Sequence, residues 1–209
     1  GIRLTYNFAR KGGYHLIPWK GEEDYRWEVL RQNPAFKGRI RWGLFNLFFI
    51  SIYQQSLILL FTLPMLLAAY GKHNALGMLD IIAALLFILF LVVETIADDQ
   101  QFRFQKEKYR RIAANEKLEE PYSAGFVRSG LWSLMRHPNY AGEQGVWISF
   151  YLFSVAATGQ WINWSMTGCV LLIFLFIGSS NFSEDISAKK YPGYKEYQNK
   201  VPRFIPKFW

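Results

Sequence analysis

Residues 144–183, "QGVWISFYLFSVAATGQWINWSMTGCVLLIFLFIGSSNFS", contain no charged side chain. As a helix, these 40 residues extend about 60 Å at about 1.5 Å per residue, which is twice the roughly 30 Å thickness of the hydrocarbon core of a bilayer. The segment therefore predicts two membrane crossings that are joined by a turn at Thr158-Gly159-Gln160. We place these two helices at about 143–158 and 161–180.

Two further apolar segments precede this one. Residues 42–71 form a run of 30 residues without a charge, long enough for one tilted span, in which Pro64 predicts a kink. A second helix is expected from about 76 to 97, with Asp80 near its outer end and Glu94 near its inner end. The sequence thus predicts an all-α polytopic membrane helix bundle with about four spans, at 43–70, 76–97, 143–158 and 161–180, forming a single domain over residues 1–209.

Lys and Arg are unevenly distributed among the segments that join these spans. Nine lie in residues 1–42, eight in 98–142 and six in 181–209, whereas 71–75 contains Lys72 alone and 158–161 contains none. The positive-inside rule then places both chain ends and the 98–142 loop in the cytoplasm. Membrane topology accounts for most of the net charge of +8. Nucleic acid is therefore not an expected partner, while anionic membrane lipid and a polyphosphorylated cofactor are.

The second span is expected to continue into the cytoplasm through "ETIADDQQFRFQKEKYRR", residues 94–111. At helical spacing, Glu94, Asp98, Gln101 and Gln105 share one face. A polar stripe of this kind is more often a solvated face. Glu94 and Asp98 nevertheless lie where lipid would otherwise begin, and ionisable groups at that depth are candidates for function.

The segment "LMRHPNYAGEQG", residues 134–145, places polar residues at the entrance of a membrane helix. Pro138 suits the first turn of a helix, so free backbone N–H groups open at the membrane surface and can attract phosphate. Asn139 and Glu143 are four residues apart and lie on one face, where they can present an amide and a carboxylate to a ligand. A simple helix-capping arrangement, with Glu143 stabilised by the helix dipole, explains the pattern equally well.

Two more polar clusters are expected on the same side of the membrane. The hairpin over 144–183 should return Glu184, and with it the Lys- and Tyr-rich tail, to the side on which Glu143 lies. The opening stretch contributes Arg3, Tyr6, Arg10, Lys11 and Tyr14, with Gly12-Gly13 permitting close backbone approach. Four convergent clusters predict a polar cleft with cations for phosphates, aromatic rings for a base and carboxylates for ribose hydroxyls. The tail read by itself could equally be a juxtamembrane amphipathic segment.

Cys169 is the only cysteine and lies in an apolar run. The chain therefore has neither a disulfide framework nor a cysteine-based metal site, and no metal site is expected.

The segments "GLWSLMRHPNYAGE", "ETIADDQQFRF", "GEEDYRW" and "YPGYKEYQNKVPRFIP" resemble the bacterial branch of the steroid 5-alpha-reductase family, whose shared region is the 3-oxo-5-alpha-steroid 4-dehydrogenase C-terminal domain. Isoprenylcysteine carboxyl methyltransferases carry a similar Arg-His-Pro-x-Tyr-x-Gly and a Tyr-rich tail. Glu143 after "NYAG", the Asp98 segment and the N-terminal Arg-Lys-Gly-Gly-Tyr favour the reductase.

The resemblance implies an NADPH-dependent membrane oxidoreductase that reduces a carbon–carbon double bond conjugated to a carbonyl, as in 4-ene-3-oxo steroids and other lipophilic small molecules. It also implies a set of cofactor-binding residues. Gln105 stands where the animal enzymes have a basic residue, and Arg103, Lys106 or Lys108 could contact the 2′-phosphate in its place. The residues assigned to the cofactor are Asp98, Asn139, Glu143, Arg136, His137, Tyr140, Arg10, Tyr14, Gln105, Glu184, Lys190, Tyr194 and Tyr197.

Family members have further membrane helices before the region that begins here with Gly1, and the Glu and Tyr that hold the substrate carbonyl belong to that part. The catalytic acid is therefore expected upstream of Gly1. Two other functions remain open, an S-adenosylmethionine-dependent membrane methyltransferase and a noncatalytic membrane subunit. The expected location is the bacterial inner membrane, or the endoplasmic reticulum if the protein is eukaryotic.

Overall fold

The computed structural model describes residues 1–14, 25–71 and 76–207, and this part of the chain contains helices and no strand. The first four residues of "GEEDYRW" and most of the expected 71–75 turn lie outside the described residues. The prediction of an all-α protein is confirmed. The chain divides into two compact units, residues 1–57 and 58–209. A single domain over 1–209 stays a prediction.

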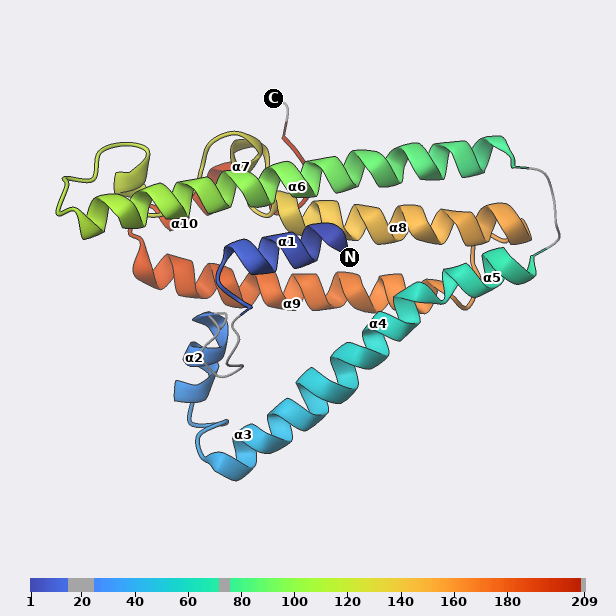
Figure 1. Cartoon of the computed structure of the whole chain (residues 1–209), viewed down its shortest axis with the longest axis horizontal. Coiled ribbons are helices and arrows are strands. Elements are labelled where there is room, and N and C mark those ends of the chain that lie inside the picture. Colours follow the sequence, from blue (N-terminus) through green and yellow to red (C-terminus); the bar gives the residue numbers. More distant parts are fainter. Residues whose placement is uncertain (15–24, 72–75, 208–209) are drawn as a thin grey trace. The chain divides into compact units, whose positions relative to one another are not determined.

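Unit 1 contains short helices and the start of a long one (Figure 1). The short helices are α1 (Ile2–Arg10) and α2 (Tyr25–Gln32). The long helical run begins with α3 (Arg39–Phe45), passes through a π-helical segment (Asn46–Tyr53) and enters α4 (Gln54–Thr62). Phe45, Phe49 and Tyr53 stack at successive ring-centroid distances of 5.1 and 5.4 Å, as residues four apart on one helical face can.

The same run ends with α5 (Pro64–Tyr70), which begins at the expected kink. Proline has no backbone N–H and is tolerated at the first position of a helix. One helix therefore ends at Thr62, and the next begins at Pro64. The predicted span over 43–70 therefore corresponds to helices within Arg39–Tyr70.

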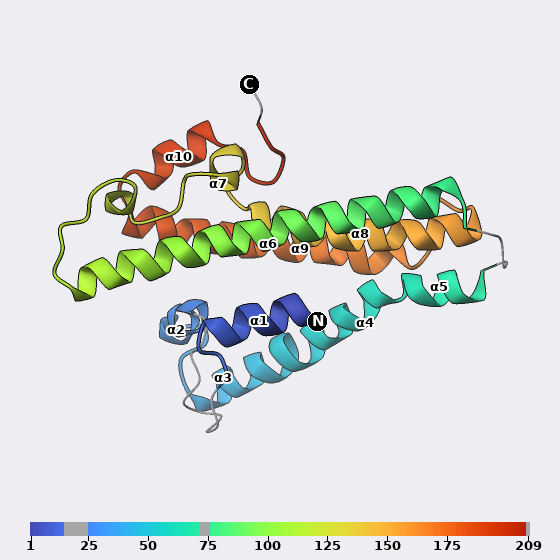
Figure 2. The same cartoon turned by 45° about the horizontal axis from the view of Figure 1, so that its top comes forward.

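Unit 2 is built on three long helices that run side by side in alternating directions (Figures 1 and 2). They are α6 (Met78–Ala113), α8 (Pro138–Thr158) and α9 (Met166–Lys190). The 36 residues of α6 extend about 54 Å, well beyond a hydrocarbon core of about 30 Å. This length confirms that the second span continues as a helix past residue 97.

Glycines allow α6 and α8 to approach closely. A Cβ atom on Gly142 would lie 2.6 Å from the Cβ atom of Glu94, and one on Gly145 would lie 2.3 Å from the ring of Phe90. Small residues at such contacts let two helix backbones pack tightly in a membrane. The Glu94 and Asp98 segment of α6 is thereby held against the first turns of α8.

The hairpin between α8 and α9 turns where expected. α8 ends at Thr158, and Gly159 follows in the left-handed conformation with φ of 71°. The connection, residues 159–165, is longer than the three-residue turn expected. Hydrogen bonds hold it, because the Tyr151 hydroxyl donates to Trp161 O (2.8 Å) and Asn163 Nδ2 donates to Ser154 Oγ (3.2 Å). α9 starts at Met166 and continues to Lys190, ten residues beyond the predicted end at 180.

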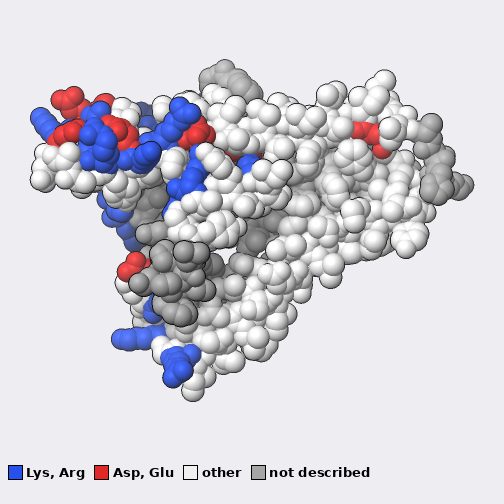
Figure 3. All heavy atoms as spheres, viewed as in Figure 1, with Lys and Arg blue, Asp and Glu red and all other residues white. Residues whose placement is uncertain are grey.

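Within the described residues, three helices are long and apolar enough to cross a membrane, namely Arg39–Tyr70, Met78–Ala113 and Met166–Lys190. α8 is a helix of 21 residues but is not among them, so the fourth crossing stays a prediction. Apolar side chains such as Leu85 and Ile88 are exposed on α6, as expected for a surface that faces lipid. In Figure 3, charged side chains gather over the end of α6 that leads to Ala113, while much of the surface over its first half carries none.

Short elements pack against the long helices at the end of unit 2 where charged side chains gather. They are a 3-10 turn (Tyr122–Ala124), α7 (Leu131–Leu134) and α10 (Tyr194–Lys200). Two small aromatic clusters anchor them. Trp132 packs with Phe104 and Val127, and Phe126 packs with Tyr194 and Tyr197. These clusters attach the loop and the tail to the long helices and so position the polar groups described next.

Candidate functional site

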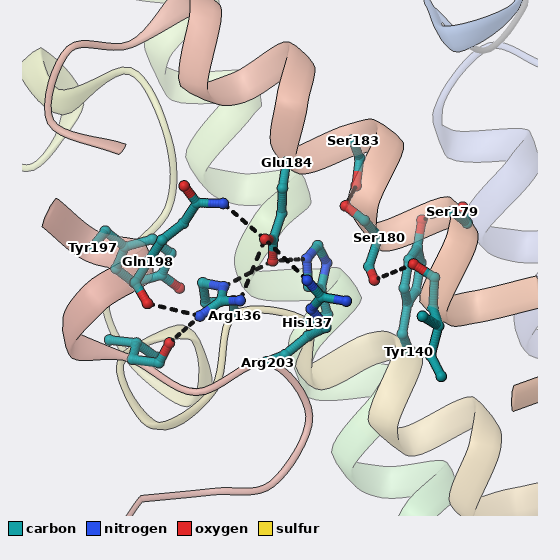
Figure 4. Close-up of polar contacts among 12 residues, drawn as sticks. Arg136, His137, Tyr140, Ser179, Ser180, Ser183, Glu184, Tyr197, Gln198 and Arg203 are labelled. Carbon is teal, nitrogen blue, oxygen red and sulfur yellow. Dashed lines mark hydrogen bonds and ion pairs between the residues drawn. The ribbon is translucent and has the colours of Figure 1, made fainter. Parts of the chain in front are cut away.

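A buried carboxylate, Glu184, lies at the centre of the polar end of unit 2 (Figure 4). Its side chain is 3% exposed. Arg136 donates from Nε to Oε1 (2.7 Å) and from Nη2 to Oε2 (3.3 Å). His137 Nε2 donates to Oε1 (2.8 Å) and Gln198 Nε2 to Oε2 (2.8 Å). Both oxygens of this carboxylate are therefore occupied by partners from within the chain.

Arg136 also binds the segment that follows α10. Its Nη1 donates to the carbonyl oxygens of Gln198 (2.9 Å) and Val201. The backbone pairs as well, because Arg136 N donates to Pro202 O (2.8 Å) and His137 N to Arg203 O (3.1 Å). The entrance of α8 and the C-terminal tail are thus held together by side chains and by main chain.

Tyr197 attaches α10 to the same region. Its hydroxyl donates to the carbonyl oxygen of Trp132, and the Trp132 indole donates from Nε1 to Ala97 O on α6 (3.2 Å). Burial raises the pKa of the Tyr197 phenol, so the group stays protonated and remains a donor. Tyr194 packs at 4.9 Å from Phe126. Tyr194 and Tyr197, both predicted to face a cofactor, are engaged in packing and internal bonding.

Asn139 and Asp98 form a second polar contact, between α8 and α6. Asn139 Nδ2 donates to Asp98 Oδ1 across a long 3.4 Å. Asn139 Oδ1 is buried and accepts no hydrogen bond from the described residues. Buried polar atoms are nearly always paired in native structures, so an acceptor without a donor marks a place where a ligand or water belongs.

Glu143 and Tyr140 lie on the first turns of α8 next to this pair. Glu143 Oε1 accepts a hydrogen bond from Trp147 Nε1 (2.8 Å). Tyr140 stacks on the His137 ring at 5.2 Å, and its hydroxyl lies 3.4 Å from the Ser179 hydroxyl of α9 (Figure 4). The hairpin therefore returns Glu184 to the end of α8 that carries Glu143, as the sequence predicts.

The remaining predicted residues are spread more widely. Arg10 donates to Asn7 (2.9 Å) and Tyr14 packs at 4.9 Å from Phe8, but both belong to unit 1 and are described only within it. Gln105 is half-buried on α6, and Lys190 ends α9 with its ammonium 5.5 Å from the Tyr191 ring centre. The assignment of a shared cofactor site to all of these residues stays a prediction.

Two residues that the sequence analysis did not single out take part in the cluster. Gln198 bonds Glu184 directly, and Arg203 Nη2 lies 3.8 Å from Glu184 Oε2, too far for a hydrogen bond. The Arg203 side chain is 32% exposed. No local pattern could have found either residue, because both reach Glu184 only through the pairing of the tail with residues 136–137.

Comparison with known proteins finds relatives of this chain. A protein of Schizosaccharomyces pombe, named only as uncharacterized, is 37% identical over 214 residues, which cover 98% of this chain and 60% of that protein. The chain thus spans about three-fifths of the length of this relative. No solved structure matches.

Residues 1–201 match the family described as "Protein of unknown function (DUF1295)". Membership of the steroid 5-alpha-reductase family stays a prediction. Because the match extends over nearly the whole chain, the protein belongs to the DUF1295 family.

Proposed function

We propose that this protein is part of a membrane-bound, NADPH-dependent oxidoreductase that reduces a carbon–carbon double bond conjugated to a carbonyl in a lipophilic substrate. The motif resemblance in four segments supports this reaction class. The observation that carries the proposal is the buried Asn139 Oδ1, an acceptor that lies beside the Asp98 carboxylate and receives no hydrogen bond from the part of the chain that the structure describes.

The acceptors at this site fit a ligand that brings N–H and O–H groups. Asn139 Oδ1 and the Asp98 carboxylate lie where α8 meets α6, and the Glu143 carboxylate lies one turn further along α8. A dinucleotide carries a carboxamide and ribose hydroxyls, which are donors of the required kind. Satisfying the Asn139 acceptor would remove the cost of a buried, unpaired polar group, which is about 1–3 kcal/mol.

Positive potential is available nearby for the phosphates. Pro138 has no N–H, and the first hydrogen bond within α8 runs from Ala141 N to His137 O (3.0 Å), so the helix begins with the positive end of its dipole. Arg203 adds a partly exposed guanidinium whose contact with Glu184 is only a loose ion pair. The residues proposed to bind hydroxyls and those proposed to bind phosphate thus lie at one end of the bundle.

When bound, the dihydronicotinamide would supply the hydride for reduction. The residues of this chain would bind and orient it. The apolar faces of α6 and α8 would exclude water beyond the site, which strengthens each polar interaction inside it. The resemblance assigns the acid that polarises the substrate carbonyl to a segment before Gly1, so we assign no catalytic acid among residues 1–209.

Nucleotide binding is the first test of this proposal. We expect the purified protein in lipid nanodiscs to bind NADPH, measured by the fluorescence of the dihydronicotinamide. Asn139→Ala should weaken binding about tenfold to a hundredfold, because a hydrogen bond in a buried site is lost. Asn199→Ala, at an exposed position of α10, is the matched control. Binding of S-adenosylmethionine without NADPH would support the methyltransferase, and binding of neither would support a noncatalytic subunit.

Turnover is the second test. Progesterone and NADPH would be offered to this chain and to a longer version carrying the helices that the family resemblance leads us to expect before Gly1. We expect reduction only by the longer version. Comparable rates for both would place the carbonyl-binding acid within residues 1–209.

The charge distribution supports a membrane orientation with residues 98–142 and 181–209 in the cytoplasm. Single cysteines at Gln160, Glu119 and Asn199, introduced in a Cys169→Ala background, would be labelled with a membrane-impermeant reagent. We expect position 160 to react from the side opposite to the other two. Labelling of all three from one side would contradict this orientation and the hairpin crossing.

A further inference from the structure

Lys108 is a buried cation near the end of α6. Its side chain is 4% exposed. The ammonium donates to one neutral acceptor, Gly125 O (2.9 Å), and otherwise lies beside the rings of Tyr109 at 4.8 Å, Tyr191 at 5.7 Å and Phe104 at 5.9 Å. Aromatic faces stabilise a cation, but a buried ammonium normally also has a negatively charged partner.

A second lysine approaches the same ring. Lys190 Nζ lies 5.5 Å from the centre of Tyr191, so two ammonium groups lie within 6 Å of one aromatic side chain. Neither lysine is paired with a carboxylate of the described residues. The hydroxyls of Tyr109 and Tyr191 likewise bond no described residue.

Neighbouring cations on the same helix differ from Lys108 because they have carboxylate partners. Arg110 and Arg111 both pair with Glu107 at 2.8 Å, and Arg110 also reaches Glu116 at 2.9 Å. Among the described residues, carboxylates are thus placed against the arginines of this surface and not against Lys108 or Lys190. The group around Tyr191 offers hydrogen-bond donors and positive charge without an acceptor of matching charge.

We propose that Lys108, Lys190 and the hydroxyls of Tyr109 and Tyr191 form a binding site for a phosphate monoester. Such a group carries about two negative charges and three acceptor oxygens, which matches two ammonium donors and two phenolic donors. It would supply the counter-charge that the buried Lys108 lacks.

Two sources of this phosphate fit the location. Lys108 is ten residues beyond Asp98 on α6, a rise of about 15 Å, which is the length scale of an extended dinucleotide. The 2′-phosphate of NADPH could therefore reach the site, and in this form the inference rests on the proposed function. Lys190 also ends α9, a helix long and apolar enough to cross a membrane, so the phosphate of a membrane lipid such as phosphatidic acid is the second source.

The decisive variant is Lys190→Met, because this exposed side chain can be removed without opening the core. Lys189→Met removes the same charge from the neighbouring exposed position and is the matched control. Lys108→Met tests the buried partner, and Lys108→Arg preserves its charge. Dissociation constants for NADPH and for NADH would be measured in phosphatidylcholine nanodiscs. Retention of phosphatidic acid would be measured separately by native mass spectrometry.

If the nucleotide is the source, Lys190→Met weakens NADPH binding about tenfold to a hundredfold and leaves NADH binding unchanged. If lipid is the source, Lys190→Met loses phosphatidic acid while both dinucleotides bind as before. Equal behaviour of Lys190→Met and Lys189→Met in both assays overturns the site. If the unmodified chain binds no dinucleotide, the proposed function fails. Loss of phosphatidic acid by Lys190→Met would then still support the phosphate site, and its retention would overturn it.

Discussion

Glu184 and Asn139 lie near each other in the fold but differ in how their polar atoms are satisfied. Glu184 is surrounded by donors, and its two oxygens accept hydrogen bonds from Arg136, His137 and Gln198. Asn139 makes one long contact with Asp98 through its nitrogen, and its buried oxygen accepts nothing from the described residues. Both were expected from the sequence to contact a cofactor. Their surroundings predict different roles.

A carboxylate whose lone pairs are occupied internally contributes to holding the fold, because a ligand would have to displace existing partners. An acceptor that is buried and unpaired costs stability until a donor arrives, and such groups are retained at functional sites. We therefore expect Glu184 to determine stability and Asn139 to determine binding.

The largest effect is expected for Glu184→Ala. Removing this carboxylate leaves Arg136 and His137 charged or polar in a buried place, and breaking a buried ion pair typically costs about 3–5 kcal/mol. This loss of stability would be measured as the decrease in the free energy of unfolding in mixed detergent micelles. Asp185→Ala removes a carboxylate from the next, exposed position of α9 and should leave stability unchanged. Equal effects of the two substitutions would mean that the Glu184 network does not hold the tail.

A smaller loss of stability is expected for Gly142→Ala. The new Cβ atom would lie 2.6 Å from Glu94 Cβ and 2.9 Å from Glu94 N, so α8 would have to move away from α6. Overpacking of this kind costs about 1–3 kcal/mol, and it should also weaken NADPH binding because Asn139 and Asp98 are separated. Gly178→Ala on α9, where no atom lies within 4 Å of the added Cβ, is the control. Full stability and affinity in Gly142→Ala would show that the close contact of α6 and α8 is not needed.

Tyr197→Phe should lower the free energy of unfolding by less than Gly142→Ala does. The substitution keeps the ring in its aromatic cluster and removes only the hydroxyl that donates to Trp132 O. A typical hydrogen bond contributes about 0.5–1.5 kcal/mol, and we expect a loss in this range without an effect on nucleotide affinity. A drop in affinity with unchanged stability would instead indicate that Tyr197 contacts the ligand.

The helices could be predicted from the sequence wherever local chemistry marks their ends. Pro138 marks the start of α8, and Gly159 marks its end. The end of α9 lies ten residues beyond the predicted one, because the stretch from Ser179 to Glu184 is polar except for Phe182 but remains helical, so the apolar pattern stops before the helix does. The hydropathy pattern indicates burial in lipid and says less about helices that leave the membrane.

The site could be predicted only in part. The spacing of polar residues predicts that the faces carrying Asp98 and Asn139 converge, whereas the contact between these two side chains is known only from the structure. The partners of Glu184 depend on a tail whose backbone pairs with Arg136 and His137, and pairing of distant segments leaves no periodic signal in either one. The internal role of Glu184 was for this reason not predicted.

The smallest effect on stability, and the most informative, is expected for Asn139→Leu. Leucine has the same branched arrangement of side-chain heavy atoms as asparagine, and it removes both Oδ1, which no described residue satisfies, and the long contact of Nδ2 with Asp98. Replacing an unsatisfied polar group by an apolar group of similar shape is close to neutral, so the free energy of unfolding should change by less than about 1 kcal/mol. NADPH affinity should nevertheless fall as far as in Asn139→Ala, because the acceptor for the ligand is lost. A loss of stability as large as that of Glu184→Ala would show that Asn139 also supports the fold, and the contrast between the two residues would be wrong.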